Sequence, residues 1–370
     1  MKLRPAPQIS AIIPYPPGKP LEELEREYGI TGSIKLASNE NPWGPSPKAV
    51  AAIAGALTSL HRYPDGSSYY LTEALAQWTG AQPAEIILGN GSNELIEFLV
   101  KVFVQPGDEV ITSHPSFLMY QKFVQVRGGV NTVIPLSNMG HDLTAILTAI
   151  TARTRLIFLD NPNNPCGTLI SREEFAEFLG RVPEEVVVVL DEAYVDFVAP
   201  ELRIDVLSCI RKPEGLAPVV ALRTFSKAFG LAGLRVGFGL MHPEIVSLMH
   251  RVRQPFNINL LGQIGATAAL ADRDHYEMTI RETTRGRAWL SAEVEGLGCR
   301  AYPSHTNFFL IDVRGDATRL YESMLYQGVI VRSMKPYGFA DFIRITVGTE
   351  AENQRFVLAL SGCLRELGYV

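Results

Sequence analysis

Hydrophobic and polar positions alternate along this chain in a regular order. From about residue 45 onward, short continuous apolar runs alternate with longer amphipathic segments. Continuous runs rich in β-branched residues are typical of strands buried on both faces, and the intervals between them are long enough for helical crossovers. The pattern therefore predicts an α/β doubly wound sheet that is mainly parallel.

The predicted strands and helices of this sheet follow one another in pairs. The strand segments are EIILG (85–89), DEVITS (108–113), RLIFLD (155–160), EVVVVLD (185–191) and PVVALR (218–223). The helical segments are NELIEFLVKVFV (93–104), YQKFVQVRG (120–128), SREEFAEFLGRV (171–182) and SKAFGLAG (226–233). Only EVVVVLD is followed by a polar loop instead. We expect the connections to be crossovers between parallel strands.

The pattern changes near residues 250–263 and predicts a second, smaller α+β domain. Long helical stretches run to about residue 298, and short apolar strands follow within 306–313, 329–334 and 342–348, with helices over 318–328 and at the C-terminal end.

The length of the chain agrees with two domains. A single hydrophobic core usually stops growing below 370 residues. We expect an N-terminal arm over residues 1–30, a large α/β domain over 31–255 and a small α+β domain over 256–370. The first 20 or so residues are rich in proline, which predicts an extended arm rather than a packed element.

Composition excludes several classes of protein. The formal net charge is -5, which argues against a general nucleic-acid binder. The cysteines are far apart and suit free thiols in a reducing compartment, and the histidines form no metal-ligand pattern. No signal peptide or membrane span is apparent, so we expect a cytoplasmic protein without a metal. The four cysteines are Cys166, Cys209, Cys299 and Cys363.

Residues with functional side chains lie directly after the predicted strands, where ligands bind in open α/β sheets. Gly91, Ser92 and Asn93 follow the first strand and begin a helix, which favours an anion, although an ordinary helix cap explains them as well. Phe117 follows the second strand and is either a core residue or a platform for a ring. Asn164 lies in a loop with two prolines after the third strand.

The last two strand ends carry the ionisable groups. Asp191 ends the fourth strand, with Tyr194 close behind, and a carboxylate buried there needs a cation or a strong donor. The fifth strand leads into Thr224, Ser226 and Lys227, with an arginine eight positions later, Arg235. Each feature alone has a structural explanation, but their recurrence at successive strand ends indicates one shared ligand.

Pyridoxal 5′-phosphate needs all of these groups. Its aldehyde needs a lysine of lowered pKa, and Lys227 lies in an apolar run near another cation. Its ring nitrogen needs a buried carboxylate such as Asp191 to stay protonated. Its phosphate needs a helix N-terminus, hydroxyls and an arginine. These last groups are supplied by Ser92, Asn93, Thr224, Ser226 and Arg235.

The chain resembles the class I/II aminotransferase family of fold type I pyridoxal-phosphate enzymes over nearly its whole length. The resemblance is carried by PYPPGKP, KLASNENPWGPSPKA, HRYPDGS, GNGSNELI, DNPNNPCGT, VVLDEAYVDF, RTFSKAFGLAGLRVGF, HTNFFLIDV, GVIVRSM and FIRITVGT. Two positions depart from the family pattern. Cys166 stands where threonine is usual, and Phe117 stands where tyrosine is common.

The resemblance implies a role for each site residue. Lys227 binds the cofactor covalently and carries a proton, and Asp191 pairs with the ring nitrogen. Tyr194 and Asn164 contact the phenolic oxygen, Phe117 stacks on the ring, and Tyr63 reaches in from the second subunit of a homodimer. The residues implied to hold the phosphate are Ser92, Asn93, Ser226 and Arg235, and the expected cofactor site also includes Gly91 and Thr224.

The resemblance also implies the substrate. Arg344 would grip its anionic end, Arg332 would add a second cation, and Tyr15 would close over the site from the arm. Two arginines and a phenol suit a phosphate better than a single carboxylate. The reaction expected first is amino transfer between L-histidinol phosphate and 2-oxoglutarate, a step of histidine biosynthesis.

Three other activities share these motifs in part. A threonine-phosphate decarboxylase would cleave a carbon–carbon bond and need no amino acceptor, and an aromatic amino-acid transaminase shares almost every motif. A pyridoxal-phosphate-dependent DNA-binding regulator would need a helix-turn-helix module before the family pattern, which already includes residues 42–47, and we expect none.

Overall fold

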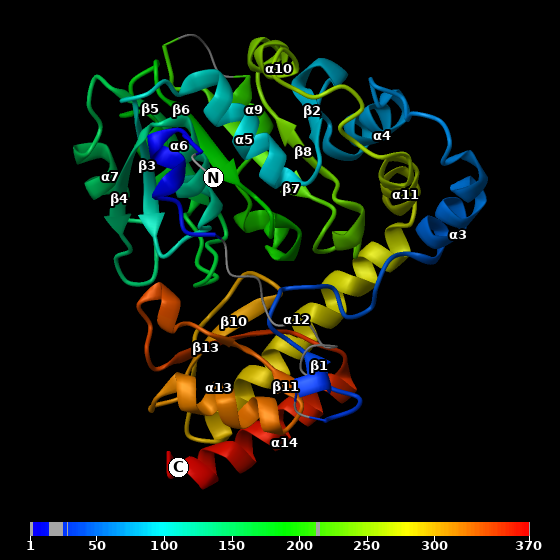
Figure 1. Ribbon diagram of the computed structural model, residues 1–370, viewed down its shortest axis with the longest axis vertical. Coiled ribbons are helices and arrows are strands. Elements are labelled where there is room, and N and C mark those ends of the chain that lie inside the picture. Colours follow the sequence, from blue (N-terminus) through cyan, green and yellow to red (C-terminus); the bar gives the residue numbers. More distant parts are fainter. Residues whose placement is uncertain (1–2, 15–24, 28, 212–214, 370) are drawn as a thin grey trace.

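The computed structural model describes residues 3–14, 25–27, 29–211 and 215–369. Its largest element is a seven-stranded sheet, called here the main sheet, with the strand order β2-β8-β7-β6-β5-β3-β4 (Figure 1). The strands are β2 (Ile86–Gly89), β3 (Glu109–His114), β4 (Val130–Pro135), β5 (Thr154–Asp160), β6 (Val187–Asp191), β7 (Val219–Thr224) and β8 (Gly237–Leu240).

The main sheet is mostly parallel, as the sequence predicts. Neighbouring strands from β7 through β6, β5 and β3 to β4 pair in parallel, whereas β8 runs antiparallel to both β7 and β2. The five strands predicted from apolar runs lie within two residues of their expected positions. Their central residues are buried on both faces, which explains the continuous hydrophobic pattern.

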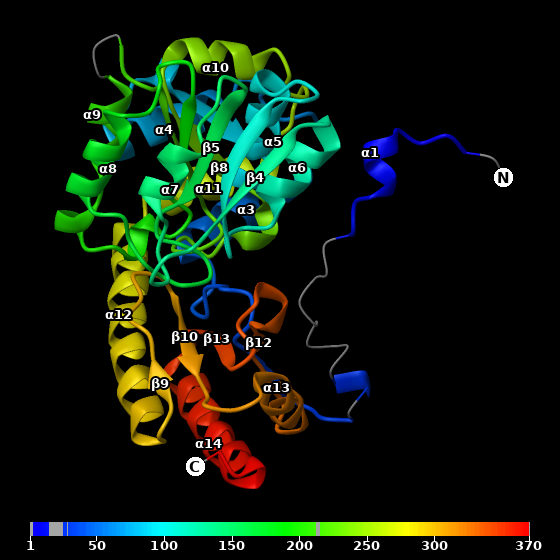
Figure 2. The same ribbon diagram turned by 90° about the vertical axis from the view of Figure 1, so that its left-hand side faces the viewer.

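Helices cover both faces of the main sheet, and Figure 2 shows α8 and α9 on one side with α5 and α6 on the other. Alternate residues of one strand face opposite cores: Val188 and Leu190 pack in one cluster, and Val187 and Val189 pack in the other. The helices associated with this sheet are α3 (Pro47–Ala56), α4 (Tyr69–Thr79), α5 (Ser92–Phe103), α6 (Met119–Arg127), α7 (Leu143–Thr148), α8 (Arg172–Leu179), α9 (Val206–Ile210), α10 (Pro243–His250) and α11 (Leu260–Leu270).

The segment SKAFGLAG is not the helix that its apolar pattern predicts. It forms a turn with one short 3₁₀ element, Ala232–Leu234, and the chain then returns as β8. Gly230 and Gly233 weaken a helix here, and Arg235 adopts a left-handed backbone with φ of 56°. The prediction was wrong because periodicity alone does not count the cost of these glycines.

A smaller antiparallel sheet, called here the small sheet, has the order β12-β13-β10-β9. Its strands are β9 (Arg300–Ala301), β10 (Phe308–Asp312), β12 (Arg332–Ser333) and β13 (Phe342–Thr346), and its helices are α12 (Arg273–Gly296), α13 (Ala317–Tyr326) and α14 (Glu350–Leu367). Buried residues of these helices and of β10 and β13 form a separate hydrophobic core. This α+β arrangement confirms the predicted class of the second unit.

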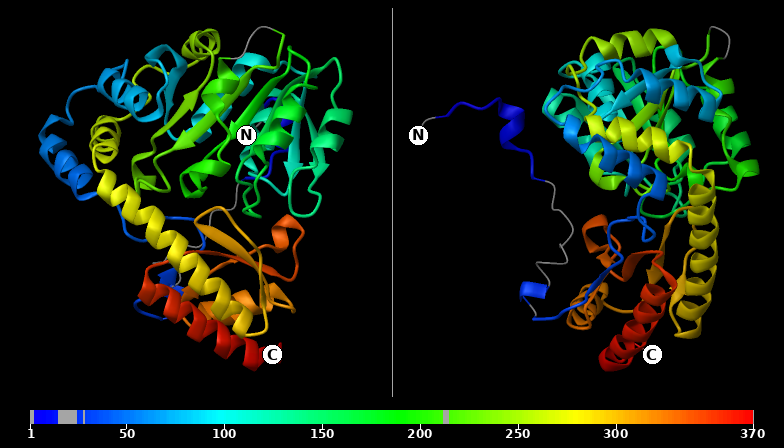
Figure 3. Two further views of the ribbon diagram at one scale, coloured as in Figure 1. Left: turned by 180° about the vertical axis from the view of Figure 1, so that it is seen from behind. Right: turned by 90° about the vertical axis from the view of Figure 1, so that its right-hand side faces the viewer.

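Helix α12 joins the main sheet to the small sheet, and the N-terminal segment around residues 34–36 packs in the same core as the small sheet. Helix α12 runs from the side of α11 to the small sheet and is seen along its length in both views of Figure 3. The N-terminal strand β1 (Ile34–Lys35) pairs in parallel with β11 (Val329–Ile330), far along the chain. Helix α11 packs on α3 and α4 beside the main sheet. The exact domain boundaries at residues 30 and 255 stay a prediction.

The N-terminal arm is described in part. Helix α1 (Pro7–Ser10) lies outside α6 (Figure 2), and the Lys122 ammonium donates to the Ile13 carbonyl. Among the described residues, no helix is long and apolar enough to cross a membrane, and no cluster of three metal-ligating side chains occurs. All four cysteines lie in the described part of the chain, and none of them forms a disulfide.

Candidate functional site

A cavity of about 240 Å³ lies where four strands of the main sheet end. Its lining includes the last residues of β5, β6 and β7 and the turn after β3. Ligands of open α/β sheets bind at this edge. The predicted site residues that line it are Ser92, Asn93, Phe117, Asn164, Asp191, Tyr194, Thr224, Ser226, Lys227 and Arg235.

Lys227 brings its amine to the cavity from the turn after β7. Its Nζ lies 3.4 Å from the Ser38 carbonyl and 5.5 Å from the centre of the Tyr194 ring. Burial lowers the pKa of Lys227 to about 8, and the positive charge of Arg344 acts in the same direction. About a tenth of this amine is then neutral, and hence nucleophilic, at pH 7, far more than for an ordinary lysine.

Asp191 ends β6 and is 5% exposed. Its Oδ2 accepts a hydrogen bond of 2.7 Å from the Tyr120 hydroxyl, and its Oδ1 accepts one from the Ala193 amide. Burial raises the pKa of Asp191 to about 7, and the neighbouring Asp160 charge adds to this rise. A carboxylate with such a high proton affinity is suited to sharing a proton with a ligand base.

Two further predicted residues are held by partners from distant parts of the chain. The Tyr194 hydroxyl accepts a 2.9 Å hydrogen bond from Asn39 Nδ2, and burial raises its pKa to about 12. Asn164 Oδ1 accepts from Arg344 Nη1, so β13 of the small sheet reaches the edge of the cavity. Arg344 also donates to the Ala37 carbonyl at 3.0 Å.

An uncapped helix N-terminus forms another wall. Helix α5 begins at Ser92, and no side chain caps its first turn. Gly91 has φ of 78°, and a Cβ built on it would lie 2.6 Å from Arg235 Nη2, so only glycine fits at this turn. The orphan N–H groups, the helix dipole and the guanidinium together favour an anion.

Hydroxyl groups from the β7 turn lie beside this wall. The Thr224 hydroxyl donates to Ser226 Oγ at 2.9 Å and accepts from the Ser226 amide at 3.1 Å. Arg235 Nη1 lies 3.5 Å from Ser226 Oγ. The left-handed backbone of Arg235 directs its side chain to this region rather than along a continuing helix.

Four of the predicted residues that the structure describes are not among the lining of the cavity, namely Gly91, Tyr63, Arg332 and Arg344. Arg332 lies opposite Arg344 in the register of the small sheet, one strand away from the cavity. Tyr63 is 83% exposed and stacks on Phe256 at 4.8 Å, so it contributes nothing to the cavity of its own chain. Tyr15 lies outside the described residues.

Sequence reasoning missed four polar residues of the lining, namely Ser38, Glu40, Tyr120 and Asp160. A signal was present for Asp160, because it ends β5 as Asp191 ends β6, and the two lie directly opposite each other in the register. Tyr120 lies in the first turn of α6, where the helical pattern alone identifies it as a core residue. Ser38 and Glu40 come from an N-terminal loop whose path depends on the small sheet.

Comparison with known proteins places this architecture in a family. A family model for aminotransferase class I and II matches residues 31–360. The chain is 62% identical to a histidinol-phosphate aminotransferase of Desulfotalea psychrophila over 370 residues, which covers 100% of this chain and 98% of that one. It is 46% identical to a histidinol-phosphate aminotransferase of Moorella thermoacetica, with 95% of this chain and 91% of the relative covered.

A solved structure agrees in fold as well as in sequence. The histidinol-phosphate aminotransferase of Sinorhizobium meliloti, in complex with pyridoxal-5′-phosphate, superposes with a TM-score of 0.91 at 30% identity and with 99% of each chain covered. Both the sequence match and the superposition extend over almost the whole chain. The chain belongs to the class I and II aminotransferase family.

Proposed function

We propose that this protein is a pyridoxal-phosphate-dependent aminotransferase that exchanges an amino group between L-histidinol phosphate and 2-oxoglutarate. One observation carries the chemistry: the Lys227 amine, the Asp191 carboxylate and the anion-binding wall of α5 face one cavity. The printed names of relatives that match the whole chain support the substrate.

The residues of the cavity fit this cofactor. Asn93 Oδ1 is buried without a hydrogen-bond partner, so the site holds a polar atom that its own chain does not satisfy. The Arg235 guanidinium lies against Gly91 at the uncapped N-terminus of α5, so a cation adjoins free backbone amides, which together suit a phosphate. An apolar ring face is provided by Phe117, which meets Tyr120 edge to face at 5.5 Å.

When bound, pyridoxal 5′-phosphate would supply an electron sink for the bonds at the substrate carbon that carries the amine. Lys227 Nζ would bind the aldehyde and, once displaced by the substrate amine, would move a proton from that carbon. Asp191 would hold a proton at the ring nitrogen, with the Tyr120 hydroxyl fixing its carboxylate. Tyr194 and Asn164 would orient the phenolic oxygen.

The substrate's anionic group would meet cations of the small sheet. Arg344 is positioned for this role because it contacts Asn164 and its charge is felt at Lys227. Arg332 stands opposite it on β12, so both side chains start from the same face of the sheet. Tyr15 is proposed to complete this end of the site from the arm.

The site is proposed to be completed by a second subunit. Tyr63 is aromatic, strongly exposed and stacked on Phe256, which is itself 44% exposed. Exposed aromatic residues are typical of interface cores. We propose that Tyr63 reaches into the cofactor site of the partner subunit in a homodimer. A cytoplasmic location and the absence of nucleic-acid and membrane partners stay predictions.

A substrate panel tests the proposed reaction. The purified protein, loaded with cofactor, is incubated with L-histidinol phosphate, phenylalanine or threonine phosphate, with and without 2-oxoglutarate, and glutamate and carbon dioxide are measured. We expect glutamate from L-histidinol phosphate only when 2-oxoglutarate is present. Carbon dioxide released without an acceptor would indicate the decarboxylase instead, and glutamate formed from phenylalanine alone would indicate the aromatic transaminase.

Replacing the lysine tests the nucleophile. Lys227→Ala removes the one group proposed to bind the aldehyde and to carry the proton, so turnover should fall by at least about a thousandfold. Borohydride treatment of the loaded protein should no longer fix the cofactor to the chain, as measured by mass spectrometry. An active Lys227→Ala variant would show that the nucleophile is elsewhere.

A further inference from the structure

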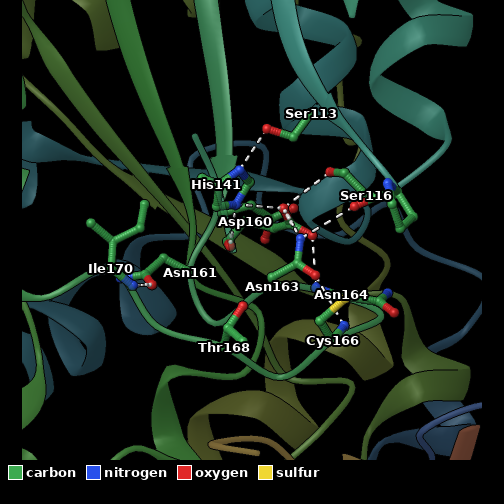
Figure 4. Close-up of polar contacts among 12 residues, drawn as sticks. Ser113, Ser116, His141, Asp160, Asn161, Asn163, Asn164, Cys166, Thr168 and Ile170 are labelled. Atoms are coloured by element: carbon green, nitrogen blue, oxygen red, sulfur yellow. Dashed lines mark hydrogen bonds and ion pairs between the residues drawn. The ribbon is translucent and has the colours of Figure 1, made fainter. Parts of the chain in front are cut away.

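A cluster of polar side chains extends from the wall of the cavity at the end of β5 (Figure 4). Asp160 is its centre and is 3% exposed. Its Oδ1 accepts hydrogen bonds of 3.0 Å from Ser116 Oγ and from Asn163 Nδ2. Its Oδ2 accepts a 2.8 Å hydrogen bond from the Asn164 amide. A buried carboxylate is tolerated where several donors converge on it, as they do here.

His141 completes this cluster from the segment before α7. Its side chain is 2% exposed, and its Nε2 lies 3.1 Å from Asp160 Oδ1 and 3.0 Å from the Asp160 carbonyl. Its Nδ1 lies 2.7 Å from Ser113 Oγ. A neutral imidazole satisfies all of these contacts if Nε2–H donates to Asp160 and Nδ1 accepts from the Ser113 hydroxyl.

The order Ser113, His141, Asp160 resembles the residues of a serine hydrolase but not their geometry. Here Nε2 faces the carboxylate and Nδ1 faces the serine, the reverse of the hydrolase arrangement. Ser113 is 1% exposed, so no substrate carbonyl can approach its hydroxyl. The cluster is therefore not a second nucleophilic centre.

The cluster connects instead to a residue of the cavity. Asp160 Oδ2 fixes the backbone amide of Asn164, and Asn164 Oδ1 accepts from Arg344 Nη1. A continuous chain of polar contacts thus runs from His141 through Asp160 and Asn164 to the small sheet. Asn164 lies on a loop, and loops hold a side chain in place less firmly than strands do unless such contacts fix them.

We propose that His141 is a positioning residue that acts through Asp160 to hold Asn164 in the orientation that the cofactor requires. The inference rests on the proposed function, in which Asn164 meets the phenolic oxygen. Without the imidazole, Asp160 Oδ1 loses one of its donors and its main-chain carbonyl loses its only side-chain contact among those described. The loop that carries Asn164 is then free to shift.

A double-mutant cycle tests this coupling on the full chain. The dissociation constant of the apoprotein for pyridoxal 5′-phosphate is measured by fluorescence titration for wild type, His141→Ala, Asn164→Ala and the double variant. We expect each single substitution to weaken binding by about tenfold. Because His141 acts through Asn164, the double variant should bind no more than about twofold more weakly than Asn164→Ala.

A second measurement distinguishes positioning from a general loss of stability. The absorbance of the bound cofactor is titrated with pH in the absence of substrate. The midpoint should move in the same direction in His141→Ala as in Asn164→Ala, because both remove the Asn164 contact from the phenolic oxygen. A lower melting temperature with an unchanged midpoint and an unchanged dissociation constant would overturn the proposal.

Matched variants accompany the cycle. His141→Gln keeps an N–H donor within reach of Asp160 and should bind the cofactor within about threefold of wild type. His275→Ala removes a half-buried histidine outside the cluster, whose Nε2 lies 3.2 Å from the Gly44 carbonyl, and should leave the affinity unchanged. If His141→Ala does not fold, Ser113→Ala takes its place in the cycle, since it removes the partner of Nδ1.

The outcomes separate this inference from the proposed function. A wild-type protein that does not bind pyridoxal 5′-phosphate at Lys227 would overturn the proposed function and this inference with it. A wild-type protein that binds it normally, while the effects of His141→Ala and Asn164→Ala simply add, would overturn only the role of His141.

Discussion

At the residue scale, burial tunes the two ionisable groups at the centre of the cavity in opposite directions. It lowers the pKa of Lys227 to about 8 and raises that of Asp191 to about 7. Desolvation penalises the charged form of both groups, so the amine loses its proton more easily and the carboxyl group keeps its proton longer. Near neutral pH both are therefore close to their midpoints, as groups that exchange protons need to be.

The lysine pKa leads to a prediction about pH. Only the neutral amine attacks an aldehyde, so the rate at which the apoprotein binds pyridoxal 5′-phosphate covalently should rise through about pH 8 and level off above it. Arg344→Gln removes a positive charge that lowers this pKa, so the rise should move to higher pH. Stopped-flow absorbance over a pH series measures both midpoints.

The neighbouring arginine provides the control. Arg332 lies opposite Arg344 on the small sheet but is not among the causes of the Lys227 shift, so Arg332→Gln should leave the midpoint in place. Equal shifts for the two variants would contradict the assignment and would point to a general effect of net charge.

Site residues that directly follow buried strands could be predicted from the sequence, whereas those in loops or on a helix were missed. Asp191 and Lys227 were accessible because they directly follow buried strands. Glu40 and His141 lie in loops without such a neighbour, and only the folded chain brings them to the site. Tyr120 lies in the first turn of α6, which packs on the sheet. Its hydroxyl donates to Asp191 only because the folded chain places this turn beside the end of β6.

At the scale of elements, the anion-binding wall depends on how closely β8 approaches α5. A Cβ built on Gly237 would lie 2.3 Å from the Ser92 amide nitrogen and 2.6 Å from the Gly91 carbonyl carbon, and both of those atoms are backbone. The glycine therefore lets the first turn of α5 rest directly on β8, the antiparallel strand between β2 and β7.

Filling that contact should damage the site. Gly237→Ala should displace the Gly91–Ser92 turn, lower the free energy of unfolding by about 1–3 kcal/mol and weaken cofactor binding by at least about tenfold. Gly233→Ala is the matched control, because nothing lies within 4 Å of its added Cβ and its φ is not positive. Denaturant unfolding and cofactor titration measure both variants, and equal behaviour of the two would refute the argument.

Two strands of the main sheet, β8 and β4, were not predicted from the sequence, for different reasons. Strand β8 reads GFGL and lacks the β-branched run that identified its neighbours, yet it is fully buried between β2 and β7. Strand β4 lies at the edge of the sheet and is largely exposed, so its hydrophobic pattern is broken. The five strands that were predicted, β2, β3, β5, β6 and β7, have buried residues almost throughout, and this burial leaves a continuous apolar signature in the sequence.

At the scale of the whole molecule, the site belongs to neither sheet alone. The main sheet supplies Asp191 and Lys227, the small sheet supplies Arg344, and the N-terminal loop supplies Ser38 and Glu40. Helix α12 joins the two sheets along one side of the molecule. A relative movement of the sheets would thus change the distance between the proposed anion site and the lysine.

The proposed dimer predicts that two poorly active variants recover activity when their subunits are mixed, which a monomeric enzyme could not do. If Tyr63 serves the partner subunit, Tyr63→Ala and Lys227→Ala should each be poorly active alone, but a mixed dimer restores one site that contains both residues. Unfolding and refolding the two variants together in equal amounts should recover about a quarter of wild-type activity. Separately refolded variants mixed afterwards, without exchange of subunits, are the control.

The absence of recovery in subunits shown to exchange would place Tyr63 in its own chain's site or in none. Analytical ultracentrifugation of the mixture shows whether the dimers form. Because Tyr63 is exposed beside Phe256, we expect the mixed dimers to recover activity.

The wide separation of the site's contributors along the chain also has a meaning for biosynthesis. The site combines a loop near residue 38 with an arginine at residue 344. Almost the whole sequence must therefore be translated before the complete site can bind pyridoxal 5′-phosphate. A ribosome-bound or prematurely terminated fragment that ends before β13 would carry the reactive lysine without the cation that tunes it. Incomplete chains would thus bind little of the cell's pyridoxal 5′-phosphate, a reactive aldehyde.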